Sequence, residues 1–554
     1  MIKMERIYRV LALALCAVSL AFAANAQERV YVSTDKECYL AGENMWISVY
    51  CLDDAAGGYS QLSKVAYLEF YNKEGLVSQI KLPLKEGRGC GRLQIPLSFA
   101  TGNYSIAAYT QKYGGASKGE FNGKIVTVFN TLSSQRVKDG VEVVPDDEPL
   151  MGDGSLKGRC NWLSVDVQTG KADGESVPVE IKNLSDKGAS VSVSIYHIDP
   201  LGEMVGAYGY DRTTLLERKG DFELSPEVDY AGEVIRVRIS SGGKKSDMKD
   251  VAVYMSAMGN TDDIYINTAD EKGEAVYYTS NIYGTRDLVF EVEGDTSSMY
   301  NVEILQQKAH HRVAGIPVLK ISPKMKEALQ SRGMDMQIAK RFEADTIFNL
   351  MPRRENSFIG TVEPRVYRLD DYTRFPVMEE VVREFVKDLR IRKEGDETVM
   401  RLLWGTKARA LVLLDGVPVT DHSVVVGLDP HLVKEIVLYS RRYVLNNRVY
   451  DGVVKFNTYK GDMGGVKLAR NVSVVNHRGV QYPLAFLGDQ LADMPNYPNF
   501  NNTIYWNPVV EIEKGGTVSF KCMKPQYKGR FRMVIEGLDS NGEEVYLSTF
   551  FTIE

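Results

Sequence analysis

The side chains that most often carry out chemistry in proteins are sparse in this chain and are not spaced for catalysis. Its six histidines are His197, His310, His311, His422, His431 and His477. A zinc protease needs two histidines one helical turn apart, and no His-Glu-x-x-His sequence occurs. His310 and His311 are adjacent, so on a strand their rings point to opposite faces. The histidines therefore predict no metal site.

One sequence of the serine-hydrolase type, Gly-x-Ser-x-Gly, occurs at residues 115–119. A nucleophilic serine in that sequence needs a strand directly before it and a helix directly after it. Tyr113 and Gly114 interrupt the approach, and Glu120–Gly123 follows in place of a helix, so a polar hairpin loop is the favoured interpretation. We therefore expect no enzyme activity and no cofactor. The carboxylates of glycosidases usually come from separate strands, so an exported hydrolase is kept as a less favoured hypothesis.

The first residues have the pattern of a secretory signal peptide. Three basic residues precede the apolar run Val10–Ala23, and Ala24-Asn25-Ala26 is a small-residue cleavage sequence. This predicts a signal peptide over residues 1–26 and an exported protein, periplasmic or associated with the outer membrane, with the cell surface also open. No later run reaches the roughly 18–20 apolar residues of a membrane helix, so we expect no transmembrane segment in the mature chain. The formal net charge of −6 argues against nucleic acid as a partner.

Cysteine use leaves two interpretations open. The cysteines that follow the predicted cleavage site are Cys38, Cys51, Cys90, Cys160 and Cys522. Their number is odd, so at least one thiol is free or pairs with another chain. A Cys38–Cys51 disulfide is one possibility in an oxidising compartment. Buried thiols are favoured, because the cysteines are few for so long a chain.

Strand patterns dominate the regions that would position any site. Ser190–Ile195 and Val234–Ile239 alternate between apolar and polar residues, as half-buried strands do. Pro376–Leu389 instead has apolar residues at helical spacing. We predict a mainly β fold with several β-sandwiches in series and one small α/β domain. The predicted division is a signal peptide (1–26), a first sandwich (27–132), a linker (133–157), a second sandwich (158–242), a third β unit (243–310), a helical and irregular connector (311–394), an α/β domain (395–465), a second connector (466–499) and a C-terminal sandwich-like domain (500–554).

The first predicted sandwich resembles a known family. Thr34-Asp35-Lys36, the later Gly42-Glu43, and Gly102-Asn103-Tyr104 before an alternating strand are similar to the second macroglobulin domain of the alpha-2-macroglobulin family. The resemblance implies an immunoglobulin-like sandwich whose first hairpin is shaped by the Thr-Asp-Lys corner and the Gly-Glu turn. The Cys-Gly-Glu-Gln thioester motif of the protease traps is missing, and Cys90-Gly91-Arg92-Leu93 does not replace it. We therefore expect the fold of that family and not its trapping reaction.

A second resemblance covers roughly residues 395–465. An apolar strand runs into the turn Asp415-Gly416, which Pro418 closes, and Asp429-Pro430 then begins one helical turn before a further strand. This order resembles the plug domain of TonB-dependent outer-membrane receptors. About ninety residues follow, whereas a barrel of 22 strands needs roughly 9–11 residues per strand. The chain is therefore not expected to be the transporter itself.

The whole arrangement resembles a group of exported, multidomain Bacteroidetes proteins. This resemblance gives the architecture more than the activity. Our first hypothesis is a non-enzymatic scaffold or adaptor whose plug-like unit docks on another envelope protein, such as an outer-membrane barrel or a lipoprotein, in association with outer-membrane transport machinery. A surface adhesin or glycan-binding protein is the alternative. The residues predicted to form the contact surface lie in two loops of the plug-like domain. The second of these loops is expected to be exposed beside the Gly452 turn. They are Asp415, Gly416 and Pro418 in the first loop, and Arg441, Arg442 and Tyr443 in the second.

Overall fold

The structure is a computed structural model that describes residues 28–53, 57–113, 120–121, 123–132, 140–146, 160–169, 176–205, 218–219, 225, 227–241, 248–258, 263–294, 298–305, 312–313, 315–341, 348–350, 358–360, 362–404, 408–486, 499–526 and 528–554. The chain divides into two compact units. The first comprises Met1–Tyr230, Gln307–Pro352 and Gln481–Glu554, and the second comprises Ala231–Gln306 and Arg353–Val480. The predicted signal peptide, the Gly-x-Ser-x-Gly sequence and the adjacent histidines lie outside the described residues.

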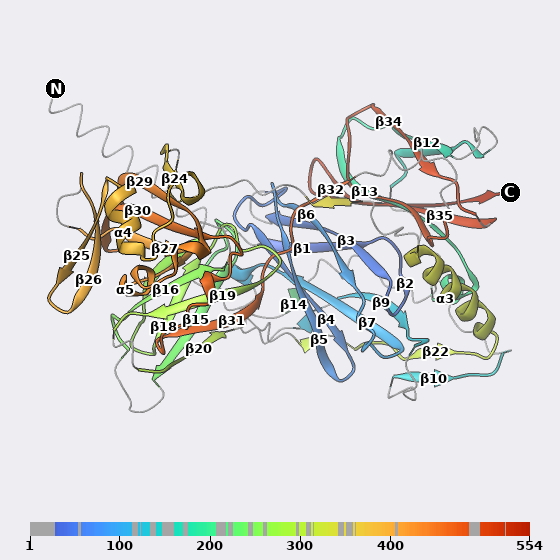
Figure 1. Cartoon of the computed structure of the whole chain (residues 1–554). Helices are drawn as coiled ribbons and strands as arrows, with labels where there is room; N and C mark the ends of the chain where they lie inside the picture. The colour runs from blue at the N-terminus through green and yellow to red at the C-terminus, as the bar shows by residue number, and fades with distance from the viewer. Residues whose placement is uncertain are drawn as a thin grey trace, which may run out of the picture. The chain divides into compact units, whose positions relative to one another are not determined.

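The first unit contains a β-sandwich near the N-terminal end of the described chain (Figure 1). One sheet has the order β1 (Glu28–Thr34), β3 (Asn44–Asp53), β6 (Arg88–Gln94). The other has the order β2 (Cys38–Leu40), β9 (Lys124–Phe129), β7 (Gly102–Tyr109), β4 (Val65–Asn72), β5 (Gly75–Pro83), and η1 (Gln111–Tyr113) follows β7. Apolar side chains such as Ile47, Leu68 and Val126 meet in one buried cluster. Alternation of side chains along the strands explains how a single core fills the space between the sheets.

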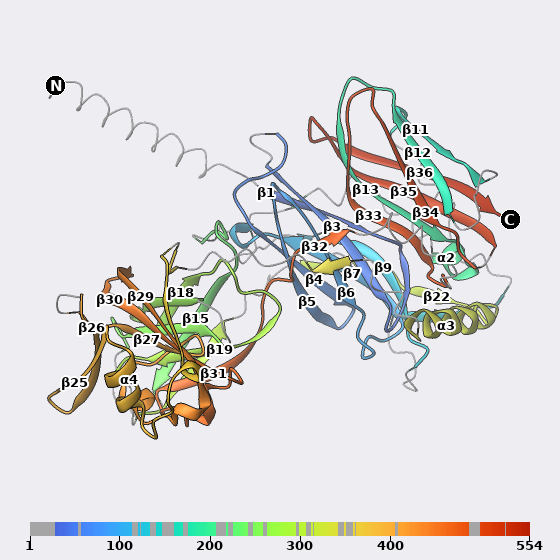
Figure 2. The same ribbon diagram turned by 45° about the horizontal axis from the view of Figure 1, so that its top comes forward.

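A second sandwich in the same unit joins two segments that are far apart in the sequence (Figure 2). One sheet has the order β11 (Leu163–Val167), β12 (Ser176–Asn183), β34 (Thr517–Met523). The other has the order β33 (Thr503–Ile512), β13 (Ala189–His197), β35 (Gly529–Asp539), β36 (Glu544–Ile553). The prediction of separate domains at 158–242 and 500–554 is therefore wrong. Because β13 hydrogen-bonds to both β33 and β35, neither segment has a complete sheet without the other.

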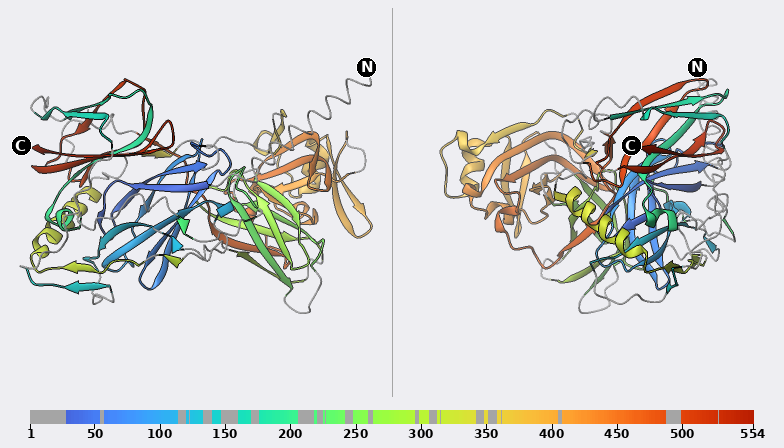
Figure 3. Two further views of the ribbon diagram at one scale, coloured as in Figure 1. Left: turned by 180° about the vertical axis from the view of Figure 1, so that it is seen from behind. Right: turned by 90° about the vertical axis from the view of Figure 1, so that its right-hand side faces the viewer.

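Helix α3 (Met325–Arg341) packs beside the first sandwich (Figure 3). Its residues Met325 and Met336 share a small core with Cys38 and Leu40. The predicted linker 133–157 needs correction, because β10 (Val141–Val143) lies within it and pairs in parallel with β22 (Leu319–Ile321) before α3. The remaining elements of this unit are α2 (Pro200–Val205), a small sheet of β14 (Arg218–Lys219), β8 (Glu120–Phe121) and β21 (Arg312–Val313), and the pair β23 (Phe348–Leu350) and β32 (Leu484–Phe486).

The second unit contains a smaller sandwich whose strands also cross the predicted boundaries. One sheet has the order β18 (Glu274–Tyr278), β15 (Val234–Ser241), β20 (Tyr300–Leu305). The other has the order β17 (Ile264–Thr268), β16 (Ala252–Ala257), β19 (Thr285–Val292), β31 (Val472–Arg478). β15 was assigned to the second sandwich and β31 to a connector, and both assignments are wrong. Ile235, Val237 and Ile239 of β15 point into the core of this third β unit, as their alternation allows.

An α/β domain completes the second unit. Its sheet has the order β24 (Arg365–Arg368), β29 (Val433–Leu445), β30 (Arg448–Thr458), β27 (Leu411–Leu414), β28 (Val417–Pro418), with β27 and β30 parallel. The helical pieces are η4 (Leu369–Asp371), α4 (Met378–Phe385), α5 (Ser423–Val426), η5 (Pro430–Leu432) and η6 (Met463–Gly465), and β25 (Leu389–Glu394) pairs with β26 (Glu397–Leu402). Because β24 belongs to this sheet, and α4 packs in its core, the predicted boundary at 395 falls inside the domain. Asp429 accepts a hydrogen bond from the backbone N–H of His431, which caps the predicted helical turn.

The prediction of a mainly β protein is confirmed, since strands account for 54% and helices for 11% of the structure. In the described part of the chain, none of the helices combines the length and the apolar character that crossing a membrane requires. No disulfide joins any two of the five described cysteines, and Cys90 is the one among them that is partly exposed. This confirms the favoured interpretation of buried thiols for the other four and removes the Cys38–Cys51 disulfide.

Candidate functional site

Residues of the first predicted contact loop are buried and hold the α/β domain together. Asp415 and Gly416 form the turn between β27 and β28, with φ values of 48° and 83°. The Asp415 carboxylate accepts hydrogen bonds from the backbone N–H and hydroxyl of Thr458, at 2.7 and 2.6 Å, and from the backbone N–H of Met463 at 2.8 Å. Its side chain is completely buried, and Pro418 is buried as well. This turn therefore fixes the end of β30 to the sheet and presents little surface to a partner.

The second predicted loop is part of the long hairpin formed by β29 and β30. The exposure predicted for Tyr443 is wrong, because this side chain is 6% exposed and its hydroxyl donates to the carbonyl of Ile359 at 3.3 Å. Arg442 is exposed, and its Nε donates to the buried Asp451 carboxylate at 2.9 Å. Arg441 is also exposed. Of the predicted residues, these two arginines remain available at the surface.

The structure does not bring the two predicted loops together. Asp415 bonds to Thr458 at one end of β30, whereas Arg442 pairs with Asp451 toward the other end. Seven residues of strand separate the two points, which corresponds to about 23 Å. Any contact surface must therefore be centred on one loop or the other.

Sequence inspection missed an exposed apolar pair at the tip of the same hairpin. Val444 and Val449 lie directly opposite each other and are 64% and 46% exposed. Their neighbours Tyr443 and Tyr450 belong to a cluster on the other face, where the Tyr450 hydroxyl hydrogen-bonds to that of Tyr254. The strand alternation of Tyr443-Val444 and Val449-Tyr450 is the signal that could have identified one buried and one open face.

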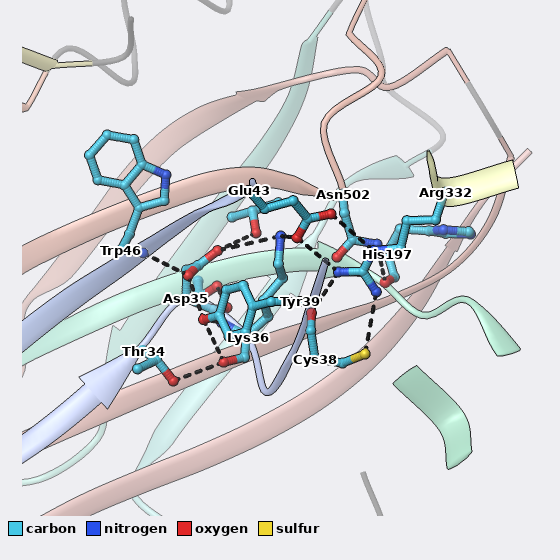
Figure 4. Close-up of polar contacts among 12 residues, drawn as sticks. Thr34, Asp35, Lys36, Cys38, Tyr39, Glu43, Trp46, His197, Arg332 and Asn502 are labelled. Carbon is cyan, nitrogen blue, oxygen red and sulfur yellow. Dashed lines mark hydrogen bonds and ion pairs between the residues drawn. The ribbon is translucent and has the colours of Figure 1, made fainter. Parts of the chain in front are cut away.

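A cavity of about 220 Å³ lies in the first unit, between α3, the β1–β2 corner and the segment 500–503. The corner is the Thr-Asp-Lys sequence that resembles macroglobulin domains (Figure 4). The Thr34 hydroxyl donates to the carbonyl of Lys36 at 2.8 Å. The Asp35 carboxylate accepts from the Tyr39 hydroxyl, the Trp46 backbone N–H and the Thr503 hydroxyl, at 2.8, 3.0 and 2.6 Å. Burial raises the pKa of Asp35, although the nearby Lys36 ammonium opposes this shift.

Arg332 connects the cavity wall to the sandwich. Its guanidinium donates to Glu43 Oε1 at 3.2 Å, to Asp199 Oδ2 at 3.2 Å and to the carbonyl of Cys38 at 2.6 Å. Lys36 Nζ lies 3.1 Å from Glu43 Oε2. Burial alone would raise the pKa of Glu43, but the charges of Arg332 and Lys36 outweigh it and lower this pKa to about 2. Glu43 therefore stays ionised and binds both cations of the cavity wall (Figure 4).

The cavity is better arranged for binding than for nucleophilic catalysis. Burial raises the pKa of the Cys38 thiol to about 12, so this residue is not a thiolate at neutral pH. Burial lowers the pKa of His197, and its ring packs against Phe531 with centroids 5.2 Å apart. The contribution of Arg332 could not be read from the sequence, since it comes from a helix almost 300 residues after the corner that it joins.

Two aromatic residues near the C-terminus are buried instead of forming a glycan-stacking surface. Tyr505 and Trp506 are 5% and 1% exposed, and Trp506 stacks on Trp46 with centroids 5.7 Å apart. Phe500 lines the cavity beside α3, and Tyr497 lies outside the described residues. Packing within the sandwich accounts for the buried pair.

No protein-family model and no curated protein matches this chain. Among solved structures it is similar to the native conformation of Escherichia coli alpha-2-macroglobulin, at 9% identity over 95% of this chain and 40% of the other, with a TM-score of 0.24. Salmonella alpha-2-macroglobulin reacted with methylamine matches at 7% identity over the same shares, also at 0.24. A tetra-tandem repeat from a large adhesion protein matches at 9% identity over 95% of this chain and all of the repeat, at 0.13. The chain spans about two fifths of the length of these macroglobulins, and TM-scores this low support no functional inference.

Proposed function

We propose that this chain is a non-enzymatic, exported scaffold or adaptor of the bacterial envelope, which docks on a protein partner through its α/β domain. The predicted signal peptide and the resemblance of residues 395–465 to a receptor plug support this proposal. The partner class is an outer-membrane barrel or its lipoprotein, associated with transport machinery. The multiple β units of the chain are suited to a scaffold, because each has a core of its own.

The observation that carries the proposal is the two-faced tip of the β29–β30 hairpin. Tyr443 and Tyr450 anchor one face, while Val444 and Val449 expose a cross-strand apolar pair on the other. An anchored hairpin loses little conformational entropy when it binds. Removing exposed apolar side chains from water is favourable and contributes to the free energy of binding. Arg441 adds an exposed positive charge nearby, which favours an acidic rim on the partner.

The proposal is tested by crosslinking native envelopes that contain the tagged protein and identifying the captured proteins by mass spectrometry. Val444→Lys and Val449→Lys together should abolish recovery of the envelope partner. Val474→Lys is the matched control, because Val474 is a strand valine of the same unit that is 43% exposed. Arg441→Glu should weaken recovery, whereas Arg442 is left unchanged because its loss would remove a cation that pairs with the buried Asp451 carboxylate.

Recovery of the same partner by the wild type and by the Val444/Val449 variant would refute the hairpin as the contact surface. Recovery of no protein partner by the wild type would refute the adaptor function and favour the adhesin alternative. Deleting residues 395–465 is a poorer test, since α4 and β24 would lose the core that they share with this segment.

A further inference from the structure

The cavity of the first unit contains one carboxylate that the described residues leave unmatched. Asp335 lines the cavity from α3, one helical turn after Arg332 and on the same face of the helix. The Glu43 and Asp199 carboxylates bind Arg332, and Asp35 accepts three hydrogen bonds. Asp335 makes neither a hydrogen bond nor an ion pair with any residue that the structure describes.

The charges around the cavity have the same imbalance. The lining carboxylates are those of Asp35, Glu43, Asp199 and Asp335, and the lining cations are those of Lys36, Arg332 and Lys340. Lys36 and Arg332 are held by Glu43 and Asp199, and Lys340 is exposed at the rim beside Gly42. Asp335 is then the lining carboxylate for which the described residues supply no cation.

The remaining walls fit an alkyl chain that ends in such a cation. Trp46, Phe500 and Met336 supply apolar surface, and Asn44 and Asn502 supply polar groups. A cavity of about 220 Å³ has room for a short alkyl chain.

We propose that this cavity binds a primary alkylammonium group, with Asp335 as its counter-ion and the Trp46 and Phe500 side chains contacting its methylene groups. The group would belong either to a free diamine or to a lysine side chain of a bound peptide, which share this chemistry. Burial and the neighbouring Asp199 charge raise the pKa of Asp335, although Arg332 opposes them, so an incoming cation would stabilise the ionised carboxylate. This site lies in the first unit and is independent of the hairpin surface in the second.

The test is a calorimetric titration of the mature protein with two probes, 1,5-diaminopentane and Nα-acetyl-lysine methylamide, at neutral pH and low salt. Both should bind, and the neutral isostere 1,5-pentanediol should bind at least tenfold more weakly than the diamine, because it lacks the charge that pairs with Asp335. Tighter binding of the lysine derivative than of the diamine identifies a peptide as the source of the ammonium. The reverse order identifies a small amine.

Asp335→Asn should weaken binding of both probes by about tenfold or more, since it removes the charge and keeps the shape. Glu327→Gln is the matched control on an exposed position of the same helix, and it should change binding less than twofold. Asp335→Glu keeps the negative charge and should retain measurable binding. It therefore distinguishes loss of the charge from loss of folding at this position. Equal affinity of wild type and Asp335→Asn, equal affinity for the diamine and 1,5-pentanediol, or no binding of either probe at 10 mM would each overturn the proposal.

Discussion

Replacing Glu291 with glutamine should stabilise the second unit at alkaline pH and leave it unchanged in acid. Glu291 lies on β19 and is 6% exposed. One of its carboxylate oxygens accepts a hydrogen bond from the Thr420 hydroxyl. Burial raises its pKa from the ordinary 4.5 to about 7, an effect that the Asp421 charge increases and the Thr420 hydrogen bond reduces. Glutamine keeps the acceptor for Thr420 and carries no charge.

The sign and size of the effect follow from proton linkage. The folded protein holds the Glu291 proton more tightly than the unfolded chain, so the free energy of unfolding falls as pH rises from about 4.5 to 7. A difference of roughly 2.5 pH units corresponds to about 3 kcal/mol. Glu291→Gln should therefore be about 3 kcal/mol more stable than wild type at pH 8, with no difference at pH 4.5.

His422 has the opposite linkage in an overlapping pH range. It is 3% exposed, its Nδ1 accepts from the backbone N–H of Met400 at 2.8 Å, and burial lowers its pKa from 6.5 to about 4. The stability that neutral His422 contributes to the folded state is fully present above pH 6.5. The free energy of unfolding falls by about 3 kcal/mol as pH falls from 6.5 toward 4. The two dependences nearly cancel between pH 4.5 and 6.5 in the wild type. In Glu291→Gln the loss due to His422 should become visible on acidification.

Urea denaturation with pulsed hydrogen exchange and mass spectrometry measures this unit separately, through peptides from β19 and β30. Glu303→Gln is the control, because this exposed glutamate lies on β20 of the same unit. His422→Asn, which keeps an acceptor near Met400, should remove the acid-side loss from the Glu291→Gln background. A Glu291→Gln protein that gains no stability at pH 8, or gains as much at pH 4.5, would refute the reasoning.

Two further predictions concern packing and thiol exposure. Gly452→Ala should destabilise the α/β domain by more than 2 kcal/mol in the same urea assay, because φ is +104° and a Cβ would lie 1.8 Å from Leu402 Cδ1. The control is Gly461→Ala, which should cost about 1 kcal/mol, because φ is +67° but the space around the residue is open. Equal losses of stability in the two variants would contradict the steric argument. A thiol reagent added to the native protein should modify Cys90 first. It should reach Cys38, Cys51, Cys160 and Cys522 only after denaturation, because those four are buried. Mass spectrometry of the labelled peptides checks this order, and rapid labelling of Cys38 in the native protein would contradict it.

Local features of the fold could be predicted from the sequence, whereas the partners of several strands could not. The Asp-Gly turn, the Asp429 cap and the strand alternation of β13 and β15 depend on neighbouring residues, and the structure has all of them. The domain boundaries depend on pairing across long insertions, such as β13 with β35 and β19 with β31. Alternation specifies which side of a strand is apolar but carries no information about which strand lies beside it.

The predicted contact residues and the cavity show the same difference between local features, which the sequence predicts, and long-range contacts, which it does not. Asp415 was recognised as a turn residue, and its three hydrogen bonds explain why it serves the fold rather than the surface. The cavity residues Asp35, Lys36, Gly42 and Glu43 lie in a recognised motif, but Arg332, Asp199 and Asp335 reach them from other parts of the first unit. Nothing in the sequence around these three residues distinguishes them from ordinary surface charges.

The polar face of β13 explains why its serines are buried and why the two sandwiches of the first unit form one body. Ser192 donates to the carbonyl of Glu536 at 3.0 Å, and the Glu536 carboxylate accepts from the Tyr31 and Ser33 hydroxyls and lies 3.6 Å from Lys124 Nζ. Each of these groups would cost free energy if it were buried without a partner. A shift of one sandwich against the other by a single residue would break several of these bonds at once. The alternation that predicted a solvent-facing strand therefore marks a buried polar interface, and its hydrogen bonds favour one arrangement of the two sandwiches.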